Sequence, residues 1–144
     1  MQKNEFDYTL TLRVTHPTLS FRELVELLGR TPRFGWTVGD PRRSSKGRDL
    51  GGIREESYCW FEVAEGTDGE LARCLRAAIS NLATRENELR VITAGGGEVM
   101  LLIYWHAEGD EGETFEPQLL GSMAKLGIHL GLNVLALAEI RGTA

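Results

Sequence analysis

The stretch FDYTLTLRVT, residues 6–15, decides the fold, because its apolar and polar residues alternate without a break. Successive side chains of a β-strand point to opposite sides of the sheet, so this period of two predicts a strand with one buried face. Pro17 ends the strand. The side chains expected to face the core are Phe6, Tyr8, Leu10, Leu12 and Val14.

A helix is predicted directly after the first strand, beginning at Ser20. Glu23 stands three residues later, which is the spacing of a capping box, and Gly29 is a natural stop. Apolar residues recur between these two points at helical intervals. The residues that follow, 33–38, predict a short second strand that ends at a turn formed by Gly39, Asp40 and Pro41.

Two more elements are predicted in the middle of the chain. Residues 57–64, SYCWFEVA, favour a strand whose two faces are both partly covered. Thr67 and Glu70 have capping-box spacing and predict the start of a helix that runs to Leu82. Residues 83–96 fit either a continuation of that helix after a break or a second short helix.

The C-terminal part predicts a strand, a helix and a strand. Residues 98–105, EVMLLIYW, are almost continuously apolar and indicate a central strand shielded at least in part on both faces. Residues 114–126 predict a helix, with Pro117 in its first turn and Gly127 after its end. Residues 128–134 alternate again and predict the last strand.

The order of these elements indicates the fold class. The first six match a ferredoxin-like βαββαβ unit, and the final helix and strand extend it. This order predicts an α+β fold with a mainly antiparallel sheet and helices on one face. No repeat or linker interrupts residues 1–144, so a single domain is expected over the whole chain.

Charge is distributed unevenly along the chain. The net charge is −5, yet residues 30–54 contain seven basic and two acidic residues. From Glu55 onward, 15 acidic residues face six basic ones. One basic region on an acidic protein argues against nucleic acid as the partner, since nucleic-acid binding usually needs an extended basic surface.

The chain contains no apolar run long enough for a membrane span and no signal peptide, so a cytoplasmic protein is expected. The two cysteines, Cys59 and Cys74, lie in a strand-like and a helix-like segment. Both are expected to be buried free thiols, because their spacing matches no redox motif.

The segment WTVGDPRRSSKGRDLGG, residues 36–52, carries the candidate site. Residues 38–54 are expected to form one long basic loop, and loops of this length are usually functional or disordered. In one interpretation its arginines, lysine and glycines clamp an anion while a tryptophan stacks on a ring. The candidate binding residues are Trp36, Gly39, Asp40, Arg42, Arg43, Lys46, Arg48 and Trp60.

The alternative interpretation is a solvated loop with no ligand. Gly39 and Asp40 then form only a turn with Pro41, and Trp36 packs against the edge of the sheet. Trp60 is expected to pack in the core or over a sheet face, and its alternative is a pocket shared with Trp36 and Tyr58. The sequence leaves both pairs of alternatives open.

Catalytic and metal-binding motifs are not found in the sequence. The glycines do not have P-loop spacing, and no nucleophile stands beside a recognisable base. The histidines His16, His106 and His129 lack ligand spacing, and the acidic residues 108–113 read as solvated surface or as a face for a basic partner. We therefore expect no enzyme activity, no cofactor and no bound metal.

Several segments resemble the bacterial proteins classified only as domain-of-unknown-function family 4279. The most specific is the Trp-x-x-Gly-Asp element at 36–40, followed by Trp60 in the next strand. Weaker segments are ELVELLGRTP at 23–32 and MAKLGIHLGLNV at 123–134. The resemblance covers nearly the whole chain and implies a bacterial setting, but no activity that could be transferred.

The sequence as a whole predicts a non-enzymatic binding protein. An immunity-type or regulatory module that binds another bacterial protein is the first hypothesis, in part by analogy with small α+β immunity proteins. The alternative is a module for a small anionic ligand or nucleotide, using Trp36 and the basic loop. A single-stranded nucleic-acid binder is the least favoured, and the sequence does not decide the oligomeric state.

Overall fold

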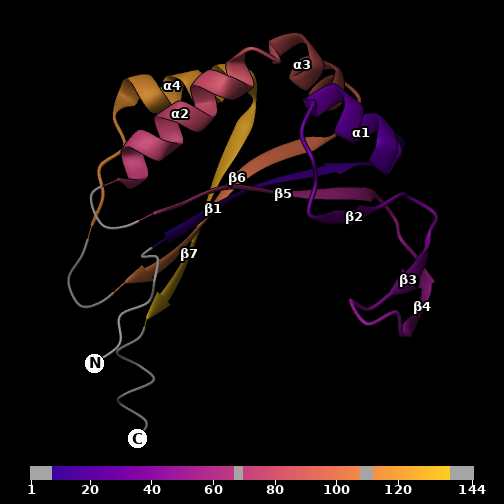
Figure 1. Ribbon diagram of the computed structural model, residues 1–144. Coiled ribbons are helices and arrows are strands. Elements are labelled where there is room, and N and C mark those ends of the chain that lie inside the picture. The colour runs from indigo at the N-terminus through magenta and orange to yellow at the C-terminus, as the bar shows by residue number, and fades with distance from the viewer. Residues whose placement is uncertain (1–7, 67–69, 108–111, 137–144) are drawn as a thin grey trace, which may run out of the picture.

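The protein has a mixed α+β fold, seen in a computed structural model that describes residues 8–66, 70–107 and 112–136. Four helices lie on one face of a five-stranded sheet (Figure 1). The strands of this sheet are β1 (Tyr8–His16), β2 (Phe34–Trp36), β5 (Ser57–Gly66), β6 (Glu98–Ala107) and β7 (Ile128–Ala136). The helices are α1 (Phe21–Leu28), α2 (Leu71–Ala83), α3 (Glu86–Ala94) and α4 (Pro117–Leu126). A separate hairpin consists of β3 (Pro41–Arg43) and β4 (Asp49–Ile53).

The sheet has the strand order β2-β5-β1-β6-β7. Strand β1 is central and runs antiparallel to both of its neighbours, and β2 is antiparallel to β5. The predicted α+β class, mainly antiparallel sheet and one-sided helices are therefore confirmed. The last pair, β6 and β7, is parallel, because α4 carries the chain back across the sheet between them.

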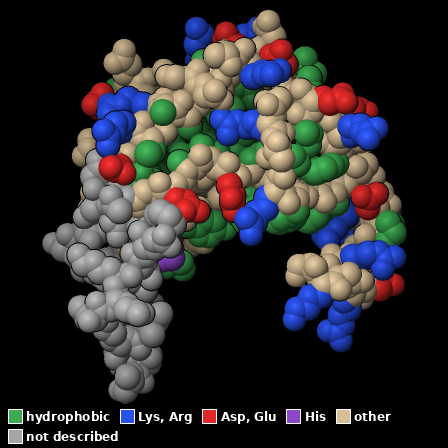
Figure 2. Space-filling model, viewed as in Figure 1, with side chains coloured by type: hydrophobic (Ala, Val, Ile, Leu, Met, Phe, Trp, Pro, Cys, Tyr) green, Lys and Arg blue, Asp and Glu red, His purple; other side chains and the backbone are tan. Residues whose placement is uncertain are grey.

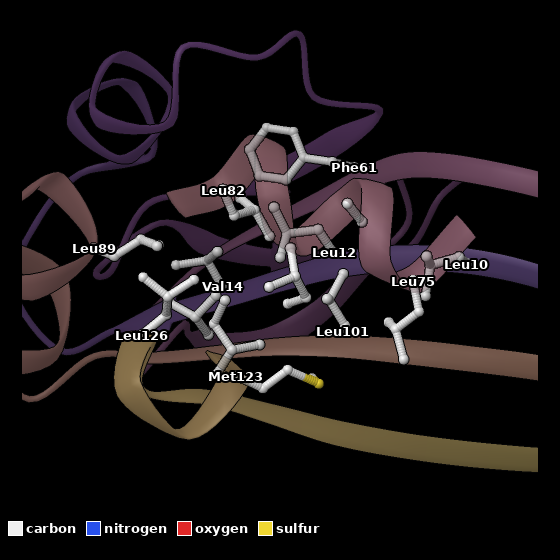
Figure 3. Close-up of a cluster of buried hydrophobic side chains, with 14 of the residues drawn as sticks. Leu10, Leu12, Val14, Phe61, Leu75, Leu82, Leu89, Leu101, Met123 and Leu126 are labelled. Carbon is white, nitrogen blue, oxygen red and sulfur yellow. The ribbon is translucent and has the colours of Figure 1, made fainter. Parts of the chain in front are cut away.

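The core lies between the sheet and the four helices (Figure 3). Leu10, Leu12 and Val14 of β1 are fully buried, as their alternation predicts. Leu12 stands opposite Phe61 of β5 and Leu101 of β6, so one side chain joins three strands. The helices contribute the buried residues Leu24, Leu75, Leu82, Leu89, Ile92, Met123 and Leu126.

Both predicted ends of α1 and the predicted C-terminal end of α4 are confirmed, whereas α4 begins at Pro117 instead of at residue 114. The Ser20 hydroxyl accepts the Glu23 N–H at 3.1 Å, which caps the first turn of α1. Gly29 and Gly127 end α1 and α4 in the left-handed conformation, with φ of 63° and 71°. Thr67 lies outside the described residues, and Glu70 makes no side-chain cap at α2. The ambiguous segment after α2 forms a second helix, α3.

Strand β6 lies in the interior of the sheet, between β1 and β7, as its continuous apolar run predicts. The helices cover only one of its faces, where Val99, Leu101 and Ile103 are fully buried. Met100 and Leu102 point to the other side and are half-buried. On that side they lie over Gly131 of β7, where a Cβ would be 2.9 Å from the Met100 sulfur and 2.8 Å from the Leu102 side chain.

The two cysteines are free thiols in different environments. Cys59 is fully buried, and burial raises the pKa of its thiol to about 12. Cys74 is half-buried instead of buried, because it lies at the margin of the core on α2. Its sulfur accepts a hydrogen bond from the Tyr8 hydroxyl at 2.8 Å.

His16 is a buried polar residue at the end of β1, only 2% exposed. Its Nδ1 accepts the backbone N–H groups of Thr18 at 3.0 Å and Leu19 at 2.9 Å, so the proton of the neutral ring is on Nε2. A Cβ on Gly97 would lie 2.7 Å from the ring, which shows how closely the chain packs around it. Burial lowers the pKa of His16 below its ordinary value of 6.5.

We predict that His16 makes the protein less stable in mild acid. Below a pH of about 6.5, His16 of the unfolded chain binds a proton more readily than His16 of the folded chain does. The free energy of unfolding therefore decreases as the pH is lowered. One proton contributes a slope of at most about 1.4 kcal/mol per pH unit. Urea unfolding at pH 7.5 and 5.5 measures this loss. His16→Asn keeps an acceptor without the titration and should lose less stability than the wild type over this range.

The exposed His129 provides the control. His129→Asn should lose as much stability as the wild type between the two pH values. If the wild type and His16→Asn lost the same stability between pH 7.5 and 5.5, His16 would not be the source of the pH dependence.

Candidate functional site

The face of the sheet opposite the helices presents the candidate site, and we call it the open face. Within the described ranges no helix lies over it (Figure 1). Its residues are the alternate positions of the strands, whose neighbours in sequence point into the core. The aromatic residues of the open face are Phe34 and Trp36 of β2, Tyr58 and Trp60 of β5, and Tyr104 of β6.

Four of these aromatic residues form one contiguous cluster, because β2 and β5 pair Phe34 with Trp60 and Trp36 with Tyr58. The rings of Trp36 and Tyr58 are stacked at 4.8 Å, and those of Phe34 and Trp60 meet edge to face at 4.9 Å. Both are favourable arrangements of aromatic pairs. We call Phe34, Trp36, Tyr58 and Trp60 the aromatic cluster.

Gly35 allows β2 to approach β5 closely enough for this cluster to form. A Cβ at this position would lie 2.1 Å from the carbonyl oxygen of Tyr58 and 2.4 Å from the ring of Phe21. Any side chain at position 35 would therefore push β2 away from the sheet. The glycine between two aromatic residues is a requirement of the site.

Arginine side chains lie against the aromatic cluster. The guanidinium carbon of Arg54 is 3.7 Å from the centre of the Trp36 ring, and that of Arg33 is 5.5 Å from the Trp60 ring. Arg33 also pairs with Glu62. Arg54 donates to the backbone carbonyl of Arg43 at 3.0 Å, which ties the aromatic cluster to the neighbouring hairpin.

The segment expected to be one long loop instead contains the β3–β4 hairpin, which projects from the body of the protein (Figure 1). We call residues 41–53 the arm. Strand β3 has only three residues and β4 contains two glycines, so neither alternation nor β-propensity indicated them. The Ser44 hydroxyl accepts the backbone N–H groups of Lys46 at 3.3 Å and Arg48 at 3.0 Å, which orders the tip.

Gly39 and Asp40 form the base of the arm and hold its two ends together. The carboxylate of Asp40 accepts the Thr37 N–H at 2.9 Å. The backbones of Gly39 and Asp40 each make one hydrogen bond with Arg54, both 2.8 Å long. Gly39 has a φ of 90°, which favours glycine. These contacts support the turn interpretation of Gly39 and Asp40.

The basic residues of the arm are exposed and gather at the lower right of the molecule in Figure 2. The ion pairs within the described parts of the chain are Arg33–Glu62, Arg73–Glu70, Arg76–Glu116 and Arg90–Glu86. None of these pairs includes an arm residue. The basic residues of the arm therefore make no ion pair with any described residue, and they are Arg42, Arg43, Lys46 and Arg48.

Three hollows lie near the candidate residues. One of about 410 Å³ lies on the open face between Arg13, Trp60 and Tyr104. A second, of about 420 Å³, lies between β2 and the arm. The polar, charged and tryptophan side chains that line this second hollow belong to Trp36, Asp40, Arg43, Ser44, Ser45 and Arg54.

The structure does not bring the candidate residues into one clamp. Trp60 belongs to the open-face hollow, whereas Trp36 and Arg43 line the hollow beside the arm. Arg42 lines a third depression with Trp36. Lys46 and Arg48 are at the exposed tip. A hairpin separates its strand residues from its tip, which a flexible loop would not do.

Trp36 fits parts of both interpretations made from the sequence. It packs at the edge of the sheet, with its indole N–H donating to the Glu56 carbonyl at 3.1 Å. It also lines the hollow beside the arm. Trp60 lies over the open face, in agreement with the sheet-face alternative, and it shares its hollow with Tyr58 but not with Trp36.

Sequence reasoning missed Arg13, Phe34, Arg54 and Tyr104. Arg13 and Tyr104 are on different strands, and only the register of β1 with its neighbours brings them together. Phe34 carried a signal that could have been used, since it is two residues from Trp36 in a predicted strand and therefore shares its face. No local pattern indicated that Arg54 would fold back over Trp36.

Comparison with known proteins identifies the family. The sequence profile described as Domain of unknown function (DUF4279) matches residues 6–137. The chain belongs to this family. No curated protein and no solved structure matches the chain. Among the residues described, no helix is both long and apolar enough to cross a membrane, and no group of three or more acidic, histidine or cysteine residues could hold a metal.

We predict that Arg54 orders the arm. Arg54→Met keeps the length of the side chain but removes its hydrogen bond to Arg43 and its charge over Trp36. Together these contacts contribute about 1 kcal/mol at a partly exposed site, so backbone amides of β3 and β4 should exchange with deuterium several-fold faster. Arg48→Met at the tip is the matched control and should leave exchange unchanged. If both substitutions changed the amide exchange of β3 and β4 equally, Arg54 would not be the residue that orders the arm.

Proposed function

We propose that the protein is a non-enzymatic binding module that holds an acidic partner protein, through the open face and the arm together. An immunity-type or regulatory role in the cytoplasm of a bacterium is the setting we propose. The observation that carries the proposal is the aromatic cluster, which lies on a sheet face that the described helices leave uncovered. The two free thiols support a reducing compartment.

The composition of the open face supports protein binding. Phe34 is 46% exposed and the other three rings of the aromatic cluster are half-buried, so the cluster offers apolar area to a partner without unfolding. Aromatic residues and arginine are the types enriched at the energetic centres of protein interfaces. Arg33 and Arg54 stand against the cluster and can bond to polar groups of the partner.

The arm supports an acidic partner. Its four bases make no ion pair with any described residue, so an acidic surface would find them available. An isolated two-stranded hairpin is marginally stable in water, and contact with a partner on its exposed side would stabilise it. Such charges mainly set the association rate and the specificity.

A protein partner fits the charge of the whole chain better than a nucleic acid does. The net charge is −5, and the residues after the arm carry the excess of acid. The phosphate backbone of a nucleic acid that extended beyond the arm would be repelled by this acidic surface. A folded partner with one acidic patch would contact the arm and the open face alone.

We also propose a ferredoxin-like ancestry for the sheet without β7. Its support is the order β2-β5-β1-β6, in which every neighbouring pair is antiparallel, together with helices on one side. The arm between β2 and β5 and the parallel strand β7 are departures from that unit. An open sheet face is common to this architecture and suits a binding role.

Site-directed photocrosslinking in the source cells tests the binding function. Phe34→p-benzoylphenylalanine places the probe on the open face, at a side chain that is 46% exposed. We expect a discrete crosslinked protein with an acidic surface, identified by mass spectrometry. Adding Arg42→Glu and Arg43→Glu should reduce the yield at least about fivefold, because two attractive contacts become repulsive.

Val91 on α3 is the matched control, because it is apolar and 52% exposed but lies on the helical side. Val91→p-benzoylphenylalanine should not give the same product. The same product from both positions would mean nonspecific contact and would reject the open face as the binding surface. No product from position 34 would reject it as well.

A second candidate is a module for a small anionic ligand with a planar ring. The hollow of about 420 Å³ beside the arm supports it, because Trp36 provides a ring and Arg43 and Arg54 provide positive charge. Ser44 and Ser45 line the same hollow. A volume of this size is within the range of small-ligand sites.

Tryptophan fluorescence distinguishes this candidate from protein binding. If a nucleotide binds beside the arm, ATP should quench the fluorescence saturably, and Trp36→Phe should abolish most of the change. Trp105→Phe is the control, since Trp105 packs against the core. A linear, nonsaturating response in the wild type would eliminate the nucleotide candidate and leave protein binding as the function to test.

A further inference from the structure

Arg13 lies at the centre of the open face. It is on β1, the central strand, directly opposite Trp60 of β5 and Met100 of β6. Its side chain is half-buried and forms part of the floor of the open-face hollow. Arginine is an unusual choice there, because a half-buried position between strands is normally occupied by an apolar or hydroxyl-bearing residue.

Tyr104 holds the guanidinium in place. One terminal nitrogen of Arg13 donates to the Tyr104 hydroxyl, and the guanidinium carbon is 5.6 Å from the centre of the same ring. The Nε of Arg13 is buried and has no hydrogen-bond partner within the described structure. The side chain is therefore positioned by one tyrosine but not fully satisfied by it.

No carboxylate neutralises this guanidinium in the parts of the chain that the structure describes. Among the described residues that line the hollow, only Glu62 is acidic, and its carboxylate pairs with Arg33. The partial burial of a positive charge without an acid is unfavourable. A bound anion would reverse this penalty, and the planar fork of a guanidinium matches a carboxylate in geometry.

The walls around Arg13 suit a flat apolar group. Phe34, Tyr58 and Trp60 line the same hollow of about 410 Å³, which is large enough for an aromatic acid. Arg13 also lies close enough to oppose the increase in the pKa of Tyr58 that burial causes. The charge and the aromatic walls are therefore parts of one site.

We propose that Arg13 anchors a subsite for a carboxylate carried next to a flat apolar group. The inference rests on the proposed binding function, since it specifies what the partner presents to the open face. A C-terminal aromatic residue combines both features, because its carboxylate and its ring belong to one residue. A free aromatic acid has the same chemistry, and the experiment below separates the two sources.

The experiment uses the whole chain and NMR titrations that follow the arginine Nε–H and tryptophan indole N–H signals. The probes are benzoate, acetate, benzyl alcohol, and N-acetylglycylphenylalanine as free acid and as amide. We expect benzoate to bind at least about tenfold more tightly than acetate or benzyl alcohol, because only benzoate provides both features. The free-acid dipeptide should exceed its amide by a similar factor.

Comparison of the two peptide forms with benzoate identifies the source of the carboxylate. Tighter binding of the free-acid dipeptide than of benzoate assigns the subsite to the chain end of a partner. Tighter binding of benzoate overturns that assignment in favour of a free aromatic acid. Equal binding of benzoate and benzyl alcohol, or of benzoate and acetate, overturns the subsite itself.

Two substitutions separate a binding role of Arg13 from a structural one. Arg13→Met should weaken benzoate binding at least about tenfold and leave the melting temperature unchanged or higher, since it removes an unneutralised charge. Arg90→Gln is the matched control, because Arg90 is also an exposed arginine in an ion pair, with Glu86, but lies on the helical side of the sheet. It should retain binding within about twofold.

A melting temperature that falls by about 4 °C or more in Arg13→Met would show that Arg13 mainly pins Tyr104, and would overturn the proposal. An equal loss of benzoate binding in Arg90→Gln would overturn it too. If Arg13→Met does not fold, Arg13→Lys keeps the charge without the fork and should bind benzoate more weakly than the wild type. Crosslinking from position 34 that persists when the titrations fail would reject this subsite and leave the binding function standing.

Discussion

The pairing of β1 with both β5 and β6 is the interaction on which the rest of the structure depends. Leu12 is opposite Phe61 on one side and Leu101 on the other, and all three are fully buried under the helices. Burial of one such side chain stabilises the fold by about 2 kcal/mol. A shift of one residue in this register would turn the whole apolar row of β1 to the opposite side of the sheet.

The same register builds the open face. When Leu12 points to the core, Arg13 must point away from it, where it meets Trp60 from β5 and reaches Tyr104 on β6. The stability of the core and the composition of the candidate site are therefore set by one arrangement of strands. Gly35 and Arg54 add the arm to this surface, the first by allowing β2 to approach and the second by bonding to Arg43.

Local signals predicted much of the fold. Helix α1 begins at the cap Ser20 and ends at Gly29, and α4 ends at Gly127, as expected. Such caps depend only on residues near them in the chain. The arm was not predicted, because β3 is too short, and β4 too rich in glycine, to show the apolar–polar alternation of a strand. The candidate residues are not gathered into one clamp, since the hairpin places Lys46 and Arg48 at the tip, away from Trp60.

By itself, the sequence determined which residues alternate along β1, where α1 begins and ends, where α4 ends, and that one segment is basic. These features depend on residues near one another in the chain. Only the tertiary structure decided that β7 runs parallel to β6, that the basic segment is an ordered arm, and that Arg13 is set among Trp60 and Tyr104. Contacts between distant strands depend on their register, which the burial of the whole core selects and which no local pattern encodes.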